Sequence, residues 1–209
     1  MRGVIFSGGT AGNPEAMKNL LQPEDRMVCA DGGYLLAERL GVMPEAVLGD
    51  MDSLKQQPKA RVLRASCDKD ETDTQLCLDY LLEAGCGEIV ILGALGGRED
   101  HTYANLMLTV YGLRRGAKVT LADPPVRVFA VTGQAEIEGK KGDLLSLFPV
   151  GGNTEGILTE GLKYPLQDET LYFDVPRGIS NVFAKDKITV RMRRGILLAM
   201  HTESGFAGW

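Results

Sequence analysis

The segment Ala46-Val47-Leu48-Gly49-Asp50-Met51-Asp52-Ser53 joins a short apolar run to two carboxylates. The apolar run has the length of a buried β-strand. Side chains two residues apart in a strand point to the same face, so we expect Asp50 and Asp52 to emerge side by side. Two negative charges ~4 Å apart repel by roughly 4 kcal/mol at an effective dielectric of about 20, and a bound cation offsets that repulsion. The pair therefore suggests a metal site, and a solvated acidic turn is the alternative.

Two earlier segments also place an apolar run of strand length directly before a turn that contains glycines. Residues 4–6 are apolar and lead into Ser7-Gly8-Gly9-Thr10, and residues 27–30 lead into Asp31-Gly32-Gly33 and an apolar-periodic stretch at 35–40. This alternation predicts an open, mostly parallel α/β sheet, whose ligands collect at the carboxyl ends of the strands.

The turns of these first units carry weaker signals of their own. The glycines near Gly8 permit a close approach of the backbone to a ligand, but the phosphate-binding pattern GxxxxGK[ST] is absent. Asp31 could cap the following helix, bind a ligand, or do both.

A second acidic cluster, residues 68–73, leads into a predicted helix that ends near Gly85. Its apolar residues recur at helical spacing, so one face should be buried and the first turn held rigidly. Thr72 and Asp73 lie on that turn, where free N–H groups and the helix dipole favour anions. A capped helix start is the alternative, but it needs only one acid.

The strand 88–92 runs into the glycine-rich segment 93–101, after which a helix is expected. Arg98 offers a planar set of donors suited to phosphate, and Asp100 could cap the helix or act as a ligand. We expect a structural, hydrogen-bonded role for His101, because no nucleophilic Ser or Cys accompanies it.

The pattern changes after Pro124-Pro125. Short runs that alternate or cluster apolar residues, at 127–131, 143–150, 170–174 and 187–193, replace the helical periodicity. We expect a hairpin at Arg194-Gly195. The chain is thus predicted to be α/β, with a Rossmann-like, mostly parallel α/β/α domain over residues 1–125 and an antiparallel β-sandwich domain over residues 126–209.

Composition excludes several classes of protein. The 209 residues include 23 basic and 28 acidic side chains, a net charge of −5 that argues against nucleic acid as a partner. The four cysteines match no metal or disulfide pattern and suggest a reduced, cytoplasmic setting. No apolar run is long enough to span a membrane, so a membrane role is not expected.

Six motifs, taken in order, carry a resemblance to a known family. They are ADGG at 30–33, GDMDS at 49–53, KDETD at 69–73, GALGGREDH at 93–101, GLKYPL at 161–166 and SN at 180–181. The set resembles the thiamine pyrophosphokinase family. That resemblance implies Mg²⁺-dependent transfer of pyrophosphate from ATP to thiamine by a homodimer with sites at the subunit interface. It also implies that the β-sandwich domain binds thiamine.

The resemblance also implies roles for single residues. Asp50, Asp52 and Asp73 would bind Mg²⁺ and, with Arg98 and Asp100, form the catalytic set. The nucleotide would contact Gly8, Asp31, Gly32, Lys69, Thr72, Asp73 and Arg98. Thiamine would contact Asp100, Ser180 and Asn181, although composition alone favours a β-turn at the last two. The residue that stacks on thiamine stays open, with Trp209 as the single tryptophan.

The chemistry expected from these residues is in-line attack of the thiamine hydroxyl on the β-phosphorus, with Mg²⁺ between the carboxylates and the ATP phosphates and AMP as leaving group. Two alternatives remain. A phosphatase of the haloacid dehalogenase type would use Asp50 as nucleophile, and a sensor would bind thiamine or a nucleotide without turnover.

Overall fold

The structure is a computed structural model that describes residues 1–10, 12–54, 56–65 and 70–205. The chain divides into two compact units, Met1–Pro124 and Pro125–Trp209. The division lies one residue before the boundary expected from Pro124-Pro125. Each unit is described on its own.

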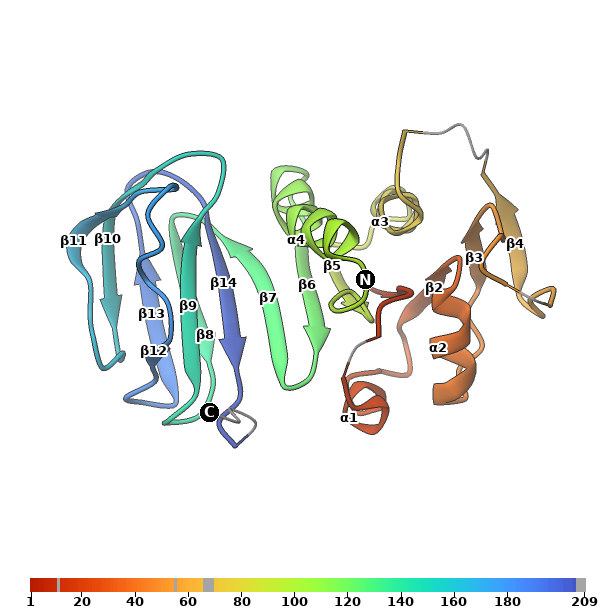
Figure 1. Ribbon diagram of the computed structural model, residues 1–209, viewed down its shortest axis with the longest axis horizontal. Helices are drawn as coiled ribbons and strands as arrows, with labels where there is room; N and C mark the ends of the chain where they lie inside the picture. The colour runs from red at the N-terminus through yellow and green to blue at the C-terminus, as the bar shows by residue number, and fades with distance from the viewer. Residues whose placement is uncertain (11, 55, 66–69, 206–209) are drawn as a thin grey trace. The chain divides into compact units, whose positions relative to one another are not determined.

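The first unit is built on parallel strands (Figure 1). They pair in the order β6-β5-β1-β2-β3-β4, and every pair is parallel. Their bounds are β1 Arg2–Phe6, β2 Arg26–Ala30, β3 Ala46–Gly49, β4 Arg61–Arg64, β5 Glu88–Leu92 and β6 Lys118–Asp123. The mostly parallel sheet predicted for this part of the chain is present.

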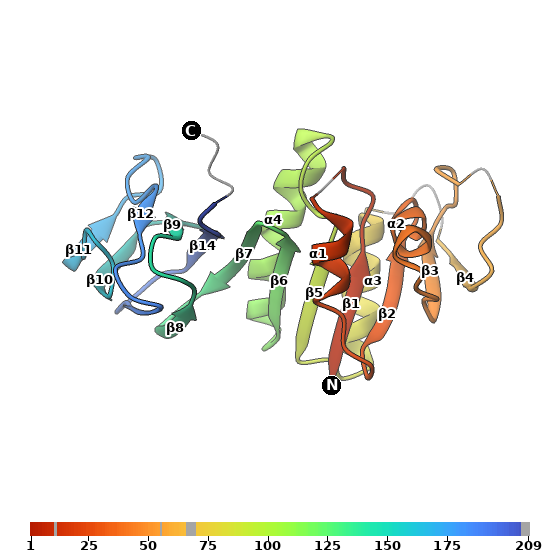
Figure 2. The ribbon, with the colours of Figure 1, turned by 90° about the horizontal axis from the view of Figure 1, so that it is seen from below.

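Helices cover both faces of this sheet (Figure 2). Helices α1 (Pro14–Lys18) and α2 (Gly33–Leu40) lie on one face, and α3 (Asp73–Glu83) and α4 (Glu99–Arg114) lie on the other. Strand alternation explains this arrangement, because neighbouring side chains of β1 enter different layers. Val4 and Phe6 join a core with Met17 of α1, whereas a Cβ on Gly3 would lie 2.6 Å from a methyl of Leu81 of α3.

The sequence pattern did not identify two of the short elements of this unit. Helix α1 and strand β4 were not predicted. Helix α1 is too short for apolar periodicity to identify it, but its start follows local rules: Pro14 is the first helical residue, and the side chain of Asn13 accepts a hydrogen bond from the backbone of Glu15.

The second unit contains two antiparallel sheets, with strand orders β12-β9-β14-β7 and β11-β10-β13-β8. One hydrophobic core takes side chains from both sheets, including Leu145 of β9 and Ile157 of β10. The strands are β7 Val126–Val131, β8 Gln134–Glu138, β9 Leu144–Pro149, β10 Thr154–Glu160, β11 Gln167–Leu171, β12 Asn181–Val182, β13 Lys187–Arg191 and β14 Leu197–Thr202.

Two predictions for this unit were wrong. Strands β13 and β14 form no hairpin at Arg194-Gly195, because β13 pairs with β8 and β10 while β14 pairs with β7 and β9. Gly195 has φ +110° and leaves no room for a side chain beside Thr154, so the chain crosses there to the other sheet. The strand expected at 170–174 lies instead at Gln167–Leu171.

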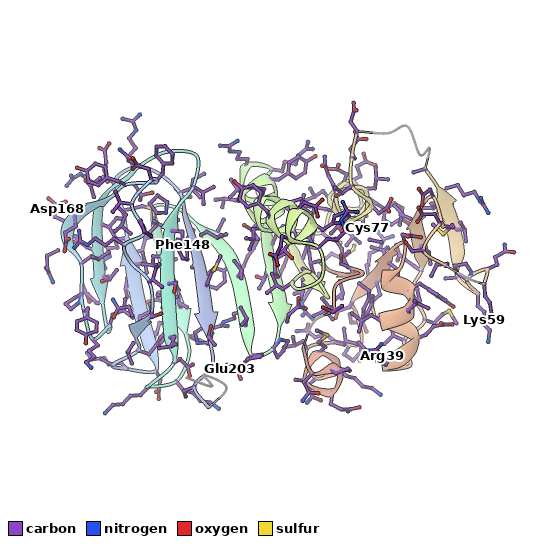
Figure 3. The ribbon with its side chains drawn as sticks, viewed as in Figure 1. Arg39, Lys59, Cys77, Phe148, Asp168 and Glu203 are labelled. Carbon is purple, nitrogen blue, oxygen red and sulfur yellow. The ribbon has the colours of Figure 1, made fainter. Side chains whose placement is uncertain are left out.

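The cysteines inside the described ranges, Cys29, Cys77 and Cys86, are buried. Cys77, labelled in Figure 3, lies on the buried face of α3. Cys67 lies outside the described residues. No helix in the described ranges has the length and apolar character needed to cross a membrane.

Candidate active site

A cleft of about 650 Å³ lies in the first unit, where the turns after β1, β2, β3 and β5 meet the first turns of α3 and α4. Its volume is that of a pocket for a small ligand. All of these turns follow the carboxyl ends of parallel strands, which is the sheet edge that the sequence pattern predicted.

Strand order explains why the cleft lies beside β1. The chain places β2, β3 and β4 on one side of β1 and then returns to place β5 and β6 on the other side. The loop after β1 therefore leads to α1 on one face of the sheet, and the loop after β5 leads to α4 on the other. Such a reversal of strand order is where open α/β sheets bind ligands.

Three carboxylates converge in the first unit. Asp31, Asp50 and Asp73 each place one oxygen so that the three atoms lie within 4.8 Å of one another. Asp31 is only 6% exposed, and its Oδ1 has no hydrogen-bond partner among the described residues. Buried carboxylate oxygens are normally paired, so this oxygen is a potential cation ligand.

Gly49, the last residue of β3, makes this convergence possible. Its φ of +148° is rarely adopted by other residues, and a Cβ would lie 2.9 Å from Cβ of Asp31 and 3.1 Å from Cγ of Asp73. Because glycine has no side chain, Asp31 and Asp73 can both approach the backbone at position 49.

Asp50 and Asp52 do not project from one strand face, contrary to the expectation. Strand β3 ends at Gly49, and Met51 has φ +69°, which breaks the alternation of side chains. The backbone N–H of Asp52 donates to Oδ1 of Asp50, and the exposed Asp52 side chain accepts from Ser53. Asp52 lines the cleft but is outside the group of three carboxylates, whose third member is Asp31.

Asp31 does not cap α2, which was one of its expected roles. Gly32 is the N-cap residue and makes no side-chain hydrogen bond. Asp31 instead has φ +38°, a left-handed conformation, and directly follows β2 with its side chain at the cleft. Gly8 and Gly32 line the cleft as well, whereas Lys69 lies outside the described residues.

The N-terminus of α3 was predicted correctly. Thr72 is its N-cap and accepts a hydrogen bond from the backbone N–H of Gln75, and Asp73 is the first helical residue. The buried hydroxyls of Ser7 and Thr74 lie 3.0 Å apart and join this turn to the end of β1. The helix start is therefore fixed against the sheet, and with it Asp73.

Arg98 and Asp100 form an exposed ion pair at the start of α4. Arg98 donates through Nε at 3.1 Å and through Nη2 at 2.6 Å to the two oxygens of Asp100. These hydrogen bonds lower the pKa of Asp100 and raise that of Arg98. Asp100 does not cap the helix, because Arg98 occupies the N-cap position.

His101 does not have the structural role expected of it. Its side chain is exposed at the cleft, and the described residues provide no hydrogen bond to its ring. The backbone N–H of His101 donates to Oδ1 of Asp100.

Ser180 and Asn181 belong to the second unit. The side chain of Asn181 accepts from the backbone N–H of Tyr164 and donates to the carbonyl of the same residue, so it holds the segment 161–166. Ser180 has φ +55° and donates its backbone N–H to the hydroxyl of Ser146. The two motifs noted separately in the sequence are thus neighbours.

Sequence reasoning missed two groups of buried polar residues. Asp123 ends β6 and binds the backbone of the turn after β5, and its position at a strand end was an available signal. In the second unit, His201 lies between Arg127 and Asp143 in a buried network. No sequence pattern joins those three residues, because they come from separate strands and a loop.

Two family models match the chain. One is described as "Thiamin pyrophosphokinase, catalytic domain" and matches residues 17–121, and the other as "Thiamin pyrophosphokinase, vitamin B1 binding domain" and matches residues 134–197. The chain belongs to the thiamin pyrophosphokinase family. All three clustered carboxylates lie inside the catalytic-domain match, and Ser180 and Asn181 lie inside the other.

Individual relatives agree with this assignment. Thiamine pyrophosphokinase of Bacillus subtilis (strain 168) is 29% identical over 182 residues, which cover 82% of this chain and 85% of the relative. Thiamine pyrophosphokinase 1 of rice, Oryza sativa subsp. japonica, is 27% identical over 198 residues, or 78% of this chain and 74% of the relative. The crystal structure of thiamine pyrophosphokinase from Bacillus subtilis superposes with a TM-score of 0.88 at 26% identity, over 98% of this chain and 100% of the solved one.

Proposed function

We propose that this member of the thiamin pyrophosphokinase family transfers a pyrophosphoryl group from ATP to the hydroxyl of thiamine, giving thiamine diphosphate and AMP. Family membership supports the reaction class. The observation that carries the proposal is the convergence of Asp31, Asp50 and Asp73 in a cleft bordered by glycine-rich turns. We further propose that the two units are a Rossmann-like domain and a β-sandwich domain.

The donor set of the cleft fits a magnesium ion. Magnesium prefers oxygen ligands and is usually held by one or two carboxylates together with substrate phosphates. The unpartnered Oδ1 of Asp31 and the close approach of three carboxylates leave negative charge that a cation would neutralise. When bound, Mg²⁺ would neutralise phosphate charge and orient the phosphates. Asp50 and Asp73 would hold it with Asp31, and Asp52 lines the same cleft.

The ion pair at the start of α4 binds and orients the substrates in this proposal, and its Arg98 lines the cleft. Arg98 offers its guanidinium to phosphate oxygens, and Asp100, ionised beside Arg98, accepts a hydrogen bond from the substrate hydroxyl. Positioning of this kind supplies much of the acceleration in phosphoryl transfer.

Thiamine is assigned to the second unit through Ser180 and Asn181, since the vitamin B1 binding model covers both. The proposal includes a homodimer with its sites at the subunit interface and a cytoplasmic location. Sedimentation at micromolar concentration tests the dimer, and a monomer at concentrations that support full activity contradicts it.

Product analysis tests the reaction. With ATP, thiamine and Mg²⁺ we expect AMP and thiamine diphosphate in equal amounts, and none after the metal is chelated. ADP with thiamine monophosphate contradicts pyrophosphoryl transfer. Binding of both ligands without AMP formation indicates a sensor, and a phosphorylated Asp50 indicates the phosphatase chemistry.

A further inference from the structure

A buried carboxylate at the end of β6 binds the backbone of the turn that follows β5. Oδ1 of Asp123 accepts a hydrogen bond from the N–H of Gly93 at 2.6 Å, and Oδ2 accepts from the N–H of Leu95 at 2.7 Å. Asp123 is 4% exposed, and no Lys or Arg of the described residues forms an ion pair with it. Backbone N–H groups of one turn therefore provide its polar contacts.

The turn held by Asp123 forms part of the cleft wall. Ala94, Gly96 and Gly97 line the cleft, whereas Asp123 itself does not. A second contact comes from α4, where the buried Asn105 donates through Nδ2 to the carbonyl of Ala94 at 2.8 Å. The turn is thus fixed from two elements.

The same turn fixes the loop after β1. Gly93 has φ +69°, and its carbonyl accepts a hydrogen bond from the N–H of Gly9 at 2.8 Å. The two segments are in tight contact, since a Cβ on Gly9 would lie 2.5 Å from that carbonyl oxygen and 2.6 Å from the carbonyl oxygen of Leu95. A shift of residues 93–95 would therefore displace the Ser7–Gly9 wall of the cleft as well.

We propose that Asp123 is a positioning residue for the reaction, which sets the two glycine-rich walls of the cleft without touching substrate. This inference rests on the proposed function. Burial raises the pKa of Asp123, and the hydrogen bonds from the backbone of the turn oppose that rise. The turn therefore stabilises the ionised carboxylate, and the carboxylate in turn satisfies the backbone N–H groups of the turn.

Asp123→Asn is the sharpest test, because it preserves shape but replaces one acceptor oxygen with an NH₂ group. That group would face a backbone N–H, so at least one hydrogen bond is lost and two donors oppose each other. We expect kcat to fall ~10- to 100-fold and KM for ATP to rise, as the walls move relative to the carboxylates.

Asp25→Asn is the matched control within the same unit. The Asp25 side chain is 1% exposed, accepts from the backbone N–H of Gln22 and pairs with Arg2, but it precedes β2 and so lies at the opposite sheet edge. We expect Asp25→Asn to lower the melting temperature while kcat and KM stay within about twofold of wild type. Wild-type kcat and KM in Asp123→Asn, or equal losses of activity in both variants, would overturn the proposal.

Two further measurements keep the inference testable. If Asp123→Asn does not fold, Asp123→Ala is assayed with and without formate, which can occupy the vacated space and accept the two N–H bonds. Restoration of kcat supports the positioning role, and no restoration in a folded variant contradicts it.

If wild-type protein makes no AMP, the proposed function fails. The inference is then decided by whether Asp123→Asn weakens ATP binding relative to Asp25→Asn.

Discussion

Single residues decide which acids form the site. The expected pair, Asp50 and Asp52, is separated by the left-handed backbone at Met51, and Asp31 takes the place of Asp52 beside Asp50 and Asp73. One oxygen of each of these three carboxylates lies within 4.8 Å of the other two, and like charges at such distances repel one another. This grouping leads to two predictions.

We expect Asp31→Asn to abolish turnover without lowering the stability of the metal-free protein, because it removes one of three mutually repelling charges. The stabilisation of the protein by Mg²⁺, measured as the shift of melting temperature on titration, should fall sharply. Asp52 lines the same cleft, and the resemblance to the family implies that it contributes to Mg²⁺ binding, so Asp52→Asn should also abolish turnover. The Asp52 side chain is exposed and outside the group of three carboxylates, so the metal-free stability of this variant should equal that of wild type. Full activity in either variant contradicts its assigned role.

We expect Gly49→Ala to lower activity at least ~10-fold and stability by about 1–3 kcal/mol, since the new Cβ would collide with Asp31 and Asp73. Gly85→Ala is the comparison: Gly85 also has a positive φ, +85°, but no atom lies within 4 Å of the added Cβ. That variant should lose stability and keep its activity. Equal activity losses in the two variants would mean that backbone strain alone explains the result. Urea unfolding and steady-state rates provide the two measurements.

At the scale of elements, α3 presents Asp73 because its first turn is capped and its body is docked. Thr72 satisfies a backbone N–H, while Cys77, Leu78 and Leu81 are buried against the sheet. Each buried leucine contributes ~1.5–3 kcal/mol. The helix therefore acts as a rigid support for a carboxylate, and the cap at Thr72 fixes the turn that carries it.

Thr72→Ala should lower the free energy of unfolding by about 1 kcal/mol through loss of the cap, and should reduce kcat because the turn that carries Asp73 frays. Thr72→Ser keeps the hydroxyl and should preserve both quantities. The free energies come from urea unfolding, and the rates from AMP release. If Thr72→Ser loses as much stability as Thr72→Ala, the methyl group matters rather than the cap.

At the scale of the molecule, the second unit contains a buried network of titratable side chains. Nε of Arg127 donates to Nδ1 of His201 at 2.9 Å, so His201 Nε2 donates to Asp143 at 2.8 Å, and the imidazole is neutral. Burial lowers the pKa of His201. Burial raises the pKa of Asp143, but hydrogen bonds from the backbone of Ser204 and Lys140 outweigh it and bring the pKa to about 2.

Both shifts favour the folded state at neutral pH. Stability from His201 is present above its unfolded pKa of about 6.5 and falls as the pH drops below that value, because the unfolded state binds the proton more tightly. Stability from Asp143, roughly 2 kcal/mol, is lost between about pH 4 and pH 2. The destabilisation caused by His201→Gln should therefore be larger at pH 7.5 than at pH 5.5 in urea unfolding. An equal effect at both pH values would contradict the titration of His201.

Much of the first unit could be predicted from its sequence. The strands before Ser7, Asp31 and Asp50, and the capped helix at Thr72, follow from local apolar patterns and turn residues. The strand pairing of the second unit was harder to predict, because its short antiparallel strands pair with partners distant in sequence. Nothing near Gly195 indicates that β13 and β14 belong to different sheets. Asp123 and His201 were missed for the same reason, since their partners are backbone groups or side chains of other elements.

The sequence by itself determined that acids and glycines follow parallel strands, and hence that they gather at one edge of a sheet. That follows from local periodicity, and parallel strands present their carboxyl ends together. Only the tertiary structure decided that Asp31 completes the group with Asp50 and Asp73, while Asp52 turns to the exposed rim. That choice depends on the strand order around β1 and on the backbone angles at Asp31, Gly49 and Met51, which arise from packing and not from any pattern in the chain.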